Sequence, residues 1–292
     1  RPNTAWLRPN TAKKTALSFD EIHLSHYGQQ LYEYLFGTGE QLQAFLEQNP
    51  AYHQGMHLTL ALYPEATALG GLPWEYLHDG QKFFSLDGQI FLSRIPGELN
   101  PLALSPAPPP LRILVAIAGP EDQAEIEIER EIAVIQEALR TLQQSGKVWA
   151  DYLEDVTLPD LESALREEPY HVLHYIGQGR YNPKQKRGYL CFENTIGGTD
   201  PVDAEQLMSI LTANRFPFRM VILSACQSAK IASADRSPKD AFDHVAMGLL
   251  QANIPAVLAM QSSILDESSI EMFQVLYTGI TQGHTLAETT LQ

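Results

Sequence analysis

Short apolar segments alternate with amphipathic segments through the second half of the chain. Apolar runs that predict strands occur at 113–118, 172–176, 220–225 and 256–260, with weaker ones at 149–153 and 189–193. Apolar residues at three- and four-residue spacing predict helices over 124–142, 159–166, 203–211, 241–251 and 266–282. Continuous apolar strands that alternate with such helices indicate an α/β fold, in which helices cover both faces of a mostly parallel sheet.

The first third of the chain follows a different pattern. Two helical patterns lie between 25 and 48, and 57–62 is a short strand candidate. The sequence Asp87-Gly88 separates the apolar runs 83–86 and 90–94, which predicts a β-hairpin. Six prolines then fall between Pro96 and Pro110, a density that prevents regular strand pairing. We therefore expect a smaller α/β subdomain at 18–97, a proline-rich linker at 98–110 and the parallel-sheet domain at 111–292.

Composition narrows the range of functions. The net charge is −15 and no basic stripe stands out, which argues against direct binding of nucleic acid. No apolar run approaches the length that a membrane-spanning helix needs, so we expect no membrane association. The chain has two cysteines, Cys191 and Cys226, too few for a disulfide framework in a protein of this size. A reducing, cytoplasmic location is the expectation.

Two unusual loops are predicted to leave the carboxyl ends of predicted strands. Gly177-Gln178-Gly179 follows the strand at 172–176, and Cys226 directly follows the strand at 220–225. Parallel sheets bind ligands beyond these strand ends, so a site is expected there. The Cys226 thiol is either aimed out of the strand end or buried as a small apolar residue. The Gly179 N–H is either a donor to a developing oxyanion or part of an ordinary turn.

Histidines do not complete this site from the sequence alone. His174 shares a strand face with Gln178, but it lies roughly 13 Å further back at ~3.3 Å per residue. His174 and His171 are therefore expected to be buried, hydrogen-bonded structural residues. The histidines show no metal-ligand spacing with carboxylates or cysteines, so no metal site and no cofactor are predicted.

Four segments, taken in order, carry a family resemblance. The segment 172–179 resembles the His-aromatic-x-Gly-His-Gly segment of the CHAT family, and 221–229 is similar to its cysteine segment. The segment 72–77 resembles its Pro-Trp-Glu element, and 254–261, followed by Asp266 and then Phe273 and Tyr277, resembles its closing segment. The cysteine segment also parallels the caspase Gln-Ala-Cys signature, whose histidine lies ~50 residues upstream, as Gln178 does here.

The resemblance implies a cysteine endopeptidase related to caspases and separases, usually attached to repeats or sensor domains. It implies that Cys226 is the nucleophile, that the N–H groups of Gly179 and Cys226 form the oxyanion hole, and that position 178 holds the general-base histidine. The partners expected are a protein or peptide substrate and a regulatory repeat, sensor domain or partner protein. Asp266 and Gln261 are expected to bind the substrate, with Asp266 lining a pocket for a basic side chain.

Position 178 departs from the family pattern because it holds glutamine. Glutamine can orient a thiol but cannot accept its proton at neutral pH, so a severe loss of activity is expected. Either the glutamine is natural and the chain is a pseudoprotease, an interaction module in a signalling or defence assembly, or it was introduced to trap a protease with its partner. A nucleotide-binding regulator is a third hypothesis, but no phosphate-binding glycine loop follows the strand at 113–118.

Overall fold

A computed structural model describes residues 19–49, 55–63, 69, 72–97, 107–123, 128–214, 218–225, 238–260, 266–286 and 289. The chain forms two compact units. The first comprises residues 1–97 together with 284–292, and the second comprises residues 98–283. In the part of the chain that the structure describes, no helix combines the length and the hydropathy needed to cross a bilayer.

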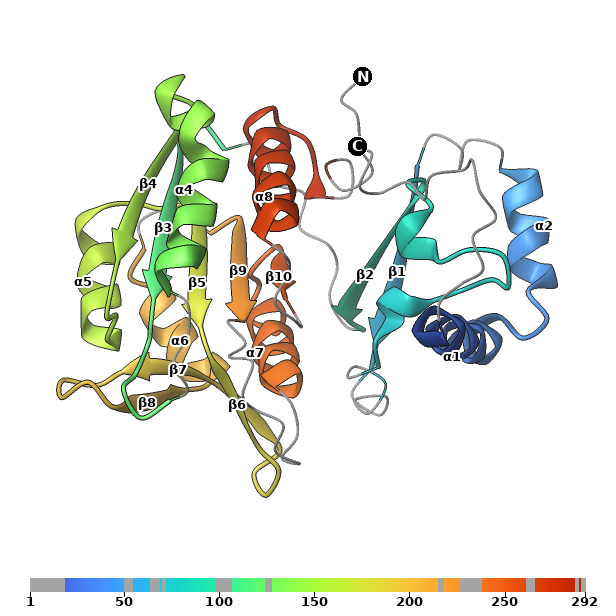
Figure 1. Cartoon of the computed structure of the whole chain (residues 1–292), viewed down its shortest axis with the longest axis horizontal. Coiled ribbons are helices and arrows are strands. Elements are labelled where there is room, and N and C mark those ends of the chain that lie inside the picture. The colour runs from blue at the N-terminus through green and yellow to red at the C-terminus, as the bar shows by residue number, and fades with distance from the viewer. Residues whose placement is uncertain are drawn as a thin grey trace. The chain divides into compact units, whose positions relative to one another are not determined.

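The second unit is built on a five-stranded parallel sheet (Figure 1). Its strands run in the order β10-β9-β5-β3-β4 and are all parallel. They are β3 (Leu111–Ile117), β4 (Val148–Leu153), β5 (Val172–Gly177), β9 (Met220–Ala225) and β10 (Val257–Ala259). Each coincides within two residues with an apolar run of the sequence, so the α/β prediction is confirmed.

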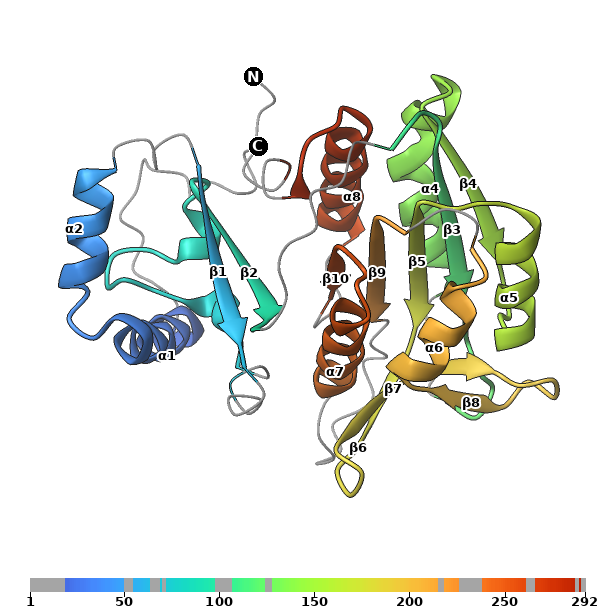
Figure 2. The same cartoon turned by 180° about the vertical axis from the view of Figure 1, so that it is seen from behind.

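Helices cover both faces of this sheet, as the two opposite views in Figures 1 and 2 show. One face carries α4 (Ile128–Gln144) and α8 (Asp266–Thr281). The other carries α5 (Leu158–Glu167), α6 (Ala204–Leu211) and α7 (Pro238–Gln251), whose apolar residues form one core with Leu173 and Tyr175 of β5. His174, which points the opposite way along β5, contacts Phe273 and Tyr277 of α8. Successive residues of β5 and β9 therefore face different helix layers.

Two of these helices begin at capping residues. Thr157 caps α5 in a reciprocal capping box with Asp160. Asp203 and Gln206 form the same arrangement at the start of α6. Both boxes satisfy backbone N–H groups that would otherwise lack partners in the first helical turn.

A second, antiparallel sheet extends from the carboxyl edge of the first one. It contains β6 (Gly179–Asn182), β7 (Arg187–Glu193) and β8 (Thr199–Val202) in that order. The sequence predicts only the middle strand. The outer two are four residues long and contain Gly179, Asn182, Asp200 and Pro201, residue types that are depleted in strands. Pairing with β7 supplies the structure that their composition does not indicate.

The first unit contains α1 (Phe19–Phe36), α2 (Glu40–Gln48), β1 (Met56–Leu62) and β2 (Ile90–Pro96). Two 3-10 turns, η3 (Trp74–Tyr76) and η4 (Phe84–Leu86), lie between the strands. Its buried core consists of five apolar residues: Leu31, Trp74, Leu77, Phe84 and Ile90. The Pro-Trp-Glu segment therefore contributes Trp74, which is 1% exposed, to the centre of this unit.

The predicted hairpin around Asp87-Gly88 is wrong. Residues 84–86 form η4 rather than a strand, and β2 pairs in parallel with the distant β1. Gly88 does adopt the left-handed conformation that the turn signal implies, with φ +66°. However, Phe84 is buried in the core and its N–H donates to the Leu77 carbonyl at 2.8 Å, which holds this segment out of a strand. Burial of Phe84 thus outweighs the local turn preference.

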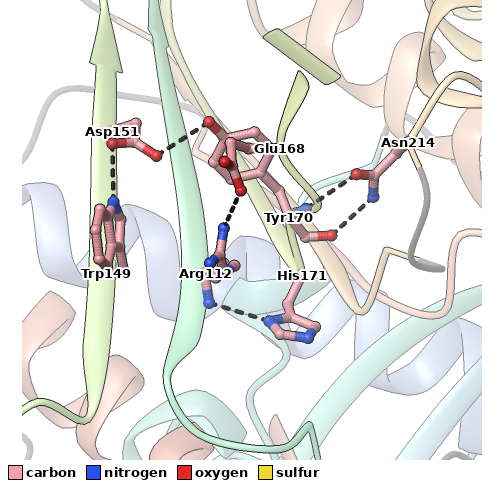
Figure 3. Close-up of polar contacts among 7 residues, drawn as sticks. All are labelled: Arg112, Trp149, Asp151, Glu168, Tyr170, His171 and Asn214. Atoms are coloured by element: carbon pink, nitrogen blue, oxygen red, sulfur yellow. Dashed lines mark hydrogen bonds and ion pairs between the residues drawn. The ribbon is translucent and has the colours of Figure 1, made fainter. Parts of the chain in front are cut away.

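A polar network ties the amino ends of β3, β4 and β5 together (Figure 3). Asn214 clamps the backbone of Tyr170: its Oδ1 accepts from the Tyr170 N–H at 2.9 Å, and its Nδ2 donates to the Tyr170 carbonyl at 2.7 Å. The Tyr170 hydroxyl donates to Asp151 at 3.0 Å, and the Arg112 N–H donates to Nδ1 of the buried His171 at 3.0 Å. The prediction that His171 is structural is confirmed.

Asn214→Ala is expected to lower the free energy of unfolding by about 1–3 kcal/mol, because it leaves two backbone groups of Tyr170 without these partners. Glu168→Gln is the contrasting variant, since the Glu168 side chain in the Arg112 ion pair is 56% exposed. Its loss should change stability by less than about 1 kcal/mol. Urea denaturation of the three proteins measures both effects, and equal effects would contradict the assignment of the clamp.

Candidate active site

The carboxyl ends of β5 and β9 lie side by side at one edge of the parallel sheet. Their register pairs Ile176 with Ser224 and Gly177 with Ala225, the last residue of each strand. Gln178 follows Gly177 directly, and Cys226 follows Ala225 in the sequence. Cys226 lies outside the residues that the structure describes, as does Gln261. Asp266 is the first residue of α8, and its side chain is not among those described.

Gln178 is a junction between two strands and not part of a loop. β5 ends at Gly177 and β6 begins at Gly179, so the predicted loop at 177–179 is wrong. The Gln178 carbonyl accepts hydrogen bonds from the Cys191 N–H at 2.9 Å and from the Tyr175 hydroxyl at 3.2 Å. The single proton of the Tyr175 hydroxyl is shared with the Cys191 carbonyl, whose oxygen lies closer, at 2.9 Å. These bonds fix the backbone at position 178 while its side chain stays half-exposed.

Gly179 packs tightly against α7. A Cβ atom at this position would lie 2.9 Å from Cβ of Ala241 and 3.0 Å from the ring of Phe242. Leu190 of β7 lies opposite Gly179. The neighbouring Cys191 N–H donates to the Gln178 carbonyl, so Gly179 and Leu190 form a non-hydrogen-bonded pair of the antiparallel ladder. The Gly179 N–H is therefore directed away from β7. Close packing explains the glycine, and the strand register explains the orientation of its N–H.

His174 is buried completely between β5, β9 and α8, with 0% exposure. Its Nδ1 lies 2.8 Å from the Tyr277 hydroxyl, and its Nε2 lies 2.9 Å from Oγ of Ser224. Burial lowers its pKa to about 3, so the ring is neutral at physiological pH. The prediction that His174 is a buried, hydrogen-bonded residue is confirmed, and both ring nitrogens are already engaged.

These hydrogen bonds form a chain with a single consistent direction. The Ser224 hydroxyl donates to Sδ of Met260 at 3.3 Å, so its oxygen accepts from His174 Nε2–H. His174 Nδ1 then accepts from the Tyr277 hydroxyl. The chain Tyr277–His174–Ser224–Met260 thus joins α8, β5, β9 and the residue after β10. Alternation along β5 and β9 puts His174 and Ser224 on one face of the sheet. The sequence alone did not predict that these two polar residues among apolar ones are hydrogen-bonded partners.

Cys191 is unsuited to nucleophilic chemistry. Its side chain is 0% exposed, and burial raises the pKa of its thiol to about 11. The thiol is therefore protonated at neutral pH.

The strands β3 and β4 are followed by acidic residues at the same edge of the sheet. Glu121 and Asp122 follow β3, and Glu154 and Asp155 follow β4. Asp122 accepts from both the N–H and the hydroxyl of Thr199, at 2.9 and 2.6 Å, and the side-chain hydrogen bond lowers its pKa. Within the described ranges, no cluster of three or more His, Cys, Asp or Glu side chains is arranged to hold a metal ion.

A five-stranded parallel sheet sandwiched by helices, with a small antiparallel sheet leaving its carboxyl edge, is consistent with the caspase-like class of α/β folds. A family model described as the CHAT domain matches residues 25–290. The chain belongs to the CHAT domain family, whose fold is related to that of caspase-like peptidases. No curated protein matches this chain.

Proposed function

We propose that this chain is a caspase-like cysteine endopeptidase domain in which Cys226 is the nucleophile and Gln178 occupies the position of the general base. The register of β5 and β9 carries the proposal. Gly177 and Ala225 are paired and directly precede positions 178 and 226, and the proposal extends this parallel register by one residue to bring the two positions together. Both positions then share the sheet face of His174 and Ser224, since side chains alternate along each strand.

The oxyanion hole of the proposed site is formed by backbone N–H groups of Gly179 and Cys226. The Gly179 N–H is suited to this role because it is directed away from β7. A donor fixed in a strand needs no reorganisation when negative charge develops on the substrate carbonyl oxygen. The packing of Gly179 against Ala241 and Phe242 holds that donor in place.

Among the described histidines of the second unit, none is positioned to replace the missing base. His171 lies just before the amino end of β5, and both nitrogens of His174 are engaged in the core. His244 of α7 packs against Tyr181, well along β6 from position 178. The proposal therefore gives the Cys226 thiol no imidazole partner among these histidines, and we expect the unaltered chain to turn over peptides slowly.

The proposed substrate is a protein or peptide segment with a basic side chain before the scissile bond. The acidic residues after β3 and β4, together with Asp266 and Gln261 as substrate-binding residues, support this preference. The net charge of −15 favours the approach of basic segments in general. A regulatory repeat, sensor domain or partner protein, in a cytoplasmic setting, completes the proposed assembly.

Labelling with peptidyl chloromethyl ketones tests the proposal without requiring a general base. A peptidyl ketone with a basic residue next to the ketone is expected to alkylate Cys226 at least about tenfold faster than chloroacetamide, which carries no peptide. The reason is that binding of the peptide aligns the electrophile with the thiol. Cys226→Ala should abolish this labelling, since Cys191 is buried. Mass spectrometry identifies the labelled residue, and a faster reaction with acidic or apolar first residues would contradict the basic preference.

A second candidate is a catalytically inactive interaction module, and glutamine at position 178 favours it. Such a module would keep the fold and bind its partner away from the thiol. Equal labelling of Cys226 by the peptidyl and peptide-free reagents would support this candidate over a peptidase site.

A further inference from the structure

The buried hydrogen-bond chain Tyr277–His174–Ser224–Met260 ends beside proposed site positions on two strands. Ser224 of β9 is two residues before Cys226 in the sequence, and Met260, its hydrogen-bond partner, directly precedes Gln261. Ser224 is the last residue but one of β9, about 3.3 Å along the strand from its final residue, Ala225, at ~3.3 Å per residue. The chain therefore lies directly behind the proposed catalytic edge.

The surroundings of the chain are apolar. His174 pairs across the sheet with Val115 and Ile222, which are both 0% exposed. Phe273 of α8 covers the His174 ring with centroids 5.0 Å apart. Ser224 and Tyr277 are 2% and 0% exposed. Buried polar groups are costly unless they are paired, so each member constrains the positions of the others.

Such a chain constrains strand ends in a way that apolar contacts do not. Apolar packing tolerates small slips, whereas a hydrogen bond weakens steeply when its distance or angle changes. The bond from His174 to Ser224 runs diagonally between β5 and β9, since the register pairs Ser224 with Ile176. A shift of one strand along the other therefore breaks it.

We propose that Ser224 and His174 are positioning residues of the peptidase site, which fix the end of β9 relative to β5 so that the Cys226 thiol meets the side chain at position 178. This inference rests on the proposed function. His174 acts through Ser224 and takes no part in proton transfer. Tyr277 orients His174 from α8, and Met260 extends the same constraint to the end of β10.

The test uses Gln178→His as the background, because its imidazole gives the thiol a partner. Alkylation of Cys226 by iodoacetamide is followed against pH to obtain the pKa of the thiol. Gln178→His is expected to lower this pKa below the ordinary ~8.5. Adding Ser224→Ala should move it back by about one unit and lower kcat about tenfold, with KM changed less than about twofold, because a small misplacement weakens the pairing.

Two matched variants separate positioning from stability. Ser224→Thr keeps the hydroxyl and is expected to retain the lowered thiol pKa. Tyr170→Phe removes a different hydroxyl bond, to Asp151 at 3.0 Å, just before the amino end of β5. It should lower stability while leaving the thiol pKa and kcat unchanged. A folded Ser224→Ala variant with unchanged thiol pKa and unchanged kcat would overturn the positioning role.

Hydrogen exchange distinguishes this failure from failure of the proposed function. In the protein that keeps Gln178, the single substitution Ser224→Ala should speed amide hydrogen exchange at Leu223 and Met260 about tenfold. The amides of β3 should keep their exchange rates. If Gln178→His leaves the thiol pKa where it was, the proposed dyad fails, and exchange alone then decides the positioning role. Unchanged exchange at Leu223 and Met260 overturns it in that case.

Discussion

Replacing Gln178 by histidine is expected to raise kcat/KM for peptide cleavage by about 10²–10⁴-fold, the usual contribution of a well-placed general acid–base. The backbone at position 178 is held by hydrogen bonds from Cys191 and Tyr175, so the new imidazole starts from a fixed point at the end of β5. It can take the thiol proton before attack and return it to the leaving amine, neither of which an amide can do. Cleavage of a fluorogenic peptide library measures the effect.

Controls for this experiment isolate the proton transfer. Gln178→Asn replaces one amide by another and should leave the low rate unchanged, whereas Gln178→His should give a bell-shaped dependence of kcat/KM on pH. Cys226→Ala in the histidine background is the blank. A folded histidine variant that cuts no faster than the unaltered chain would mean that an absent activating partner is needed, or that the domain serves as a scaffold.

Acidification is expected to destabilise the second unit well above the pH at which carboxylates titrate. The pKa of His174 is about 3 in the folded protein and about 6.5 when the chain is unfolded. Below pH 6.5 the unfolded state therefore binds a proton that the folded state refuses, and stability falls as pH falls. The loss from His174 alone amounts to about 2 kcal/mol between pH 7 and pH 5, from a slope approaching ~1.4 kcal/mol per pH unit.

The pKa of His171 is also lowered, by burial and by the charges of Arg219 and Arg112, so it adds to the same slope. Urea denaturation at several values between pH 7 and pH 5 measures the slope before ordinary carboxylates begin to protonate. His174→Gln should remove the contribution of His174 to the slope of unfolding free energy against pH. The contribution of His171 should remain. A wild-type stability that stays flat across this window would contradict a neutral, buried His174.

The parallel sheet was predictable because its strands are apolar on both faces. Runs such as 113–118 and 220–225 have no other plausible place than a covered sheet, and the helices between them carry clear apolar stripes. The antiparallel sheet was not, because β6 and β8 depend on pairing with β7 and have weak strand composition of their own. The hairpin at Asp87-Gly88 failed for a related reason, since the burial of Phe84 is a tertiary effect that no local pattern contains.

The candidate site was predictable in outline and less so in its support. Strand ends located Gln178 and Gly179 at the carboxyl edge, and the family pattern assigned their proposed roles. Spacing along β5 also excluded His174 as a base. The partners of His174 were missed, because Tyr277 lies on α8 and its hydrogen bond depends on how that helix packs. Polar residues at even spacing on two neighbouring apolar strands were the available signal.

The pairing of Gly177 with Ala225 also restricts how this domain can vary in length. Exchange of one apolar side chain for another within β5 or β9 leaves the alternation of faces intact. Deletion or insertion of a single residue in β9, ahead of Ser224, would turn the Ser224 side chain toward the layer of α5, α6 and α7, away from His174. Length variation is therefore expected in the connections between elements, while these two strands tolerate substitutions but no single-residue insertions or deletions.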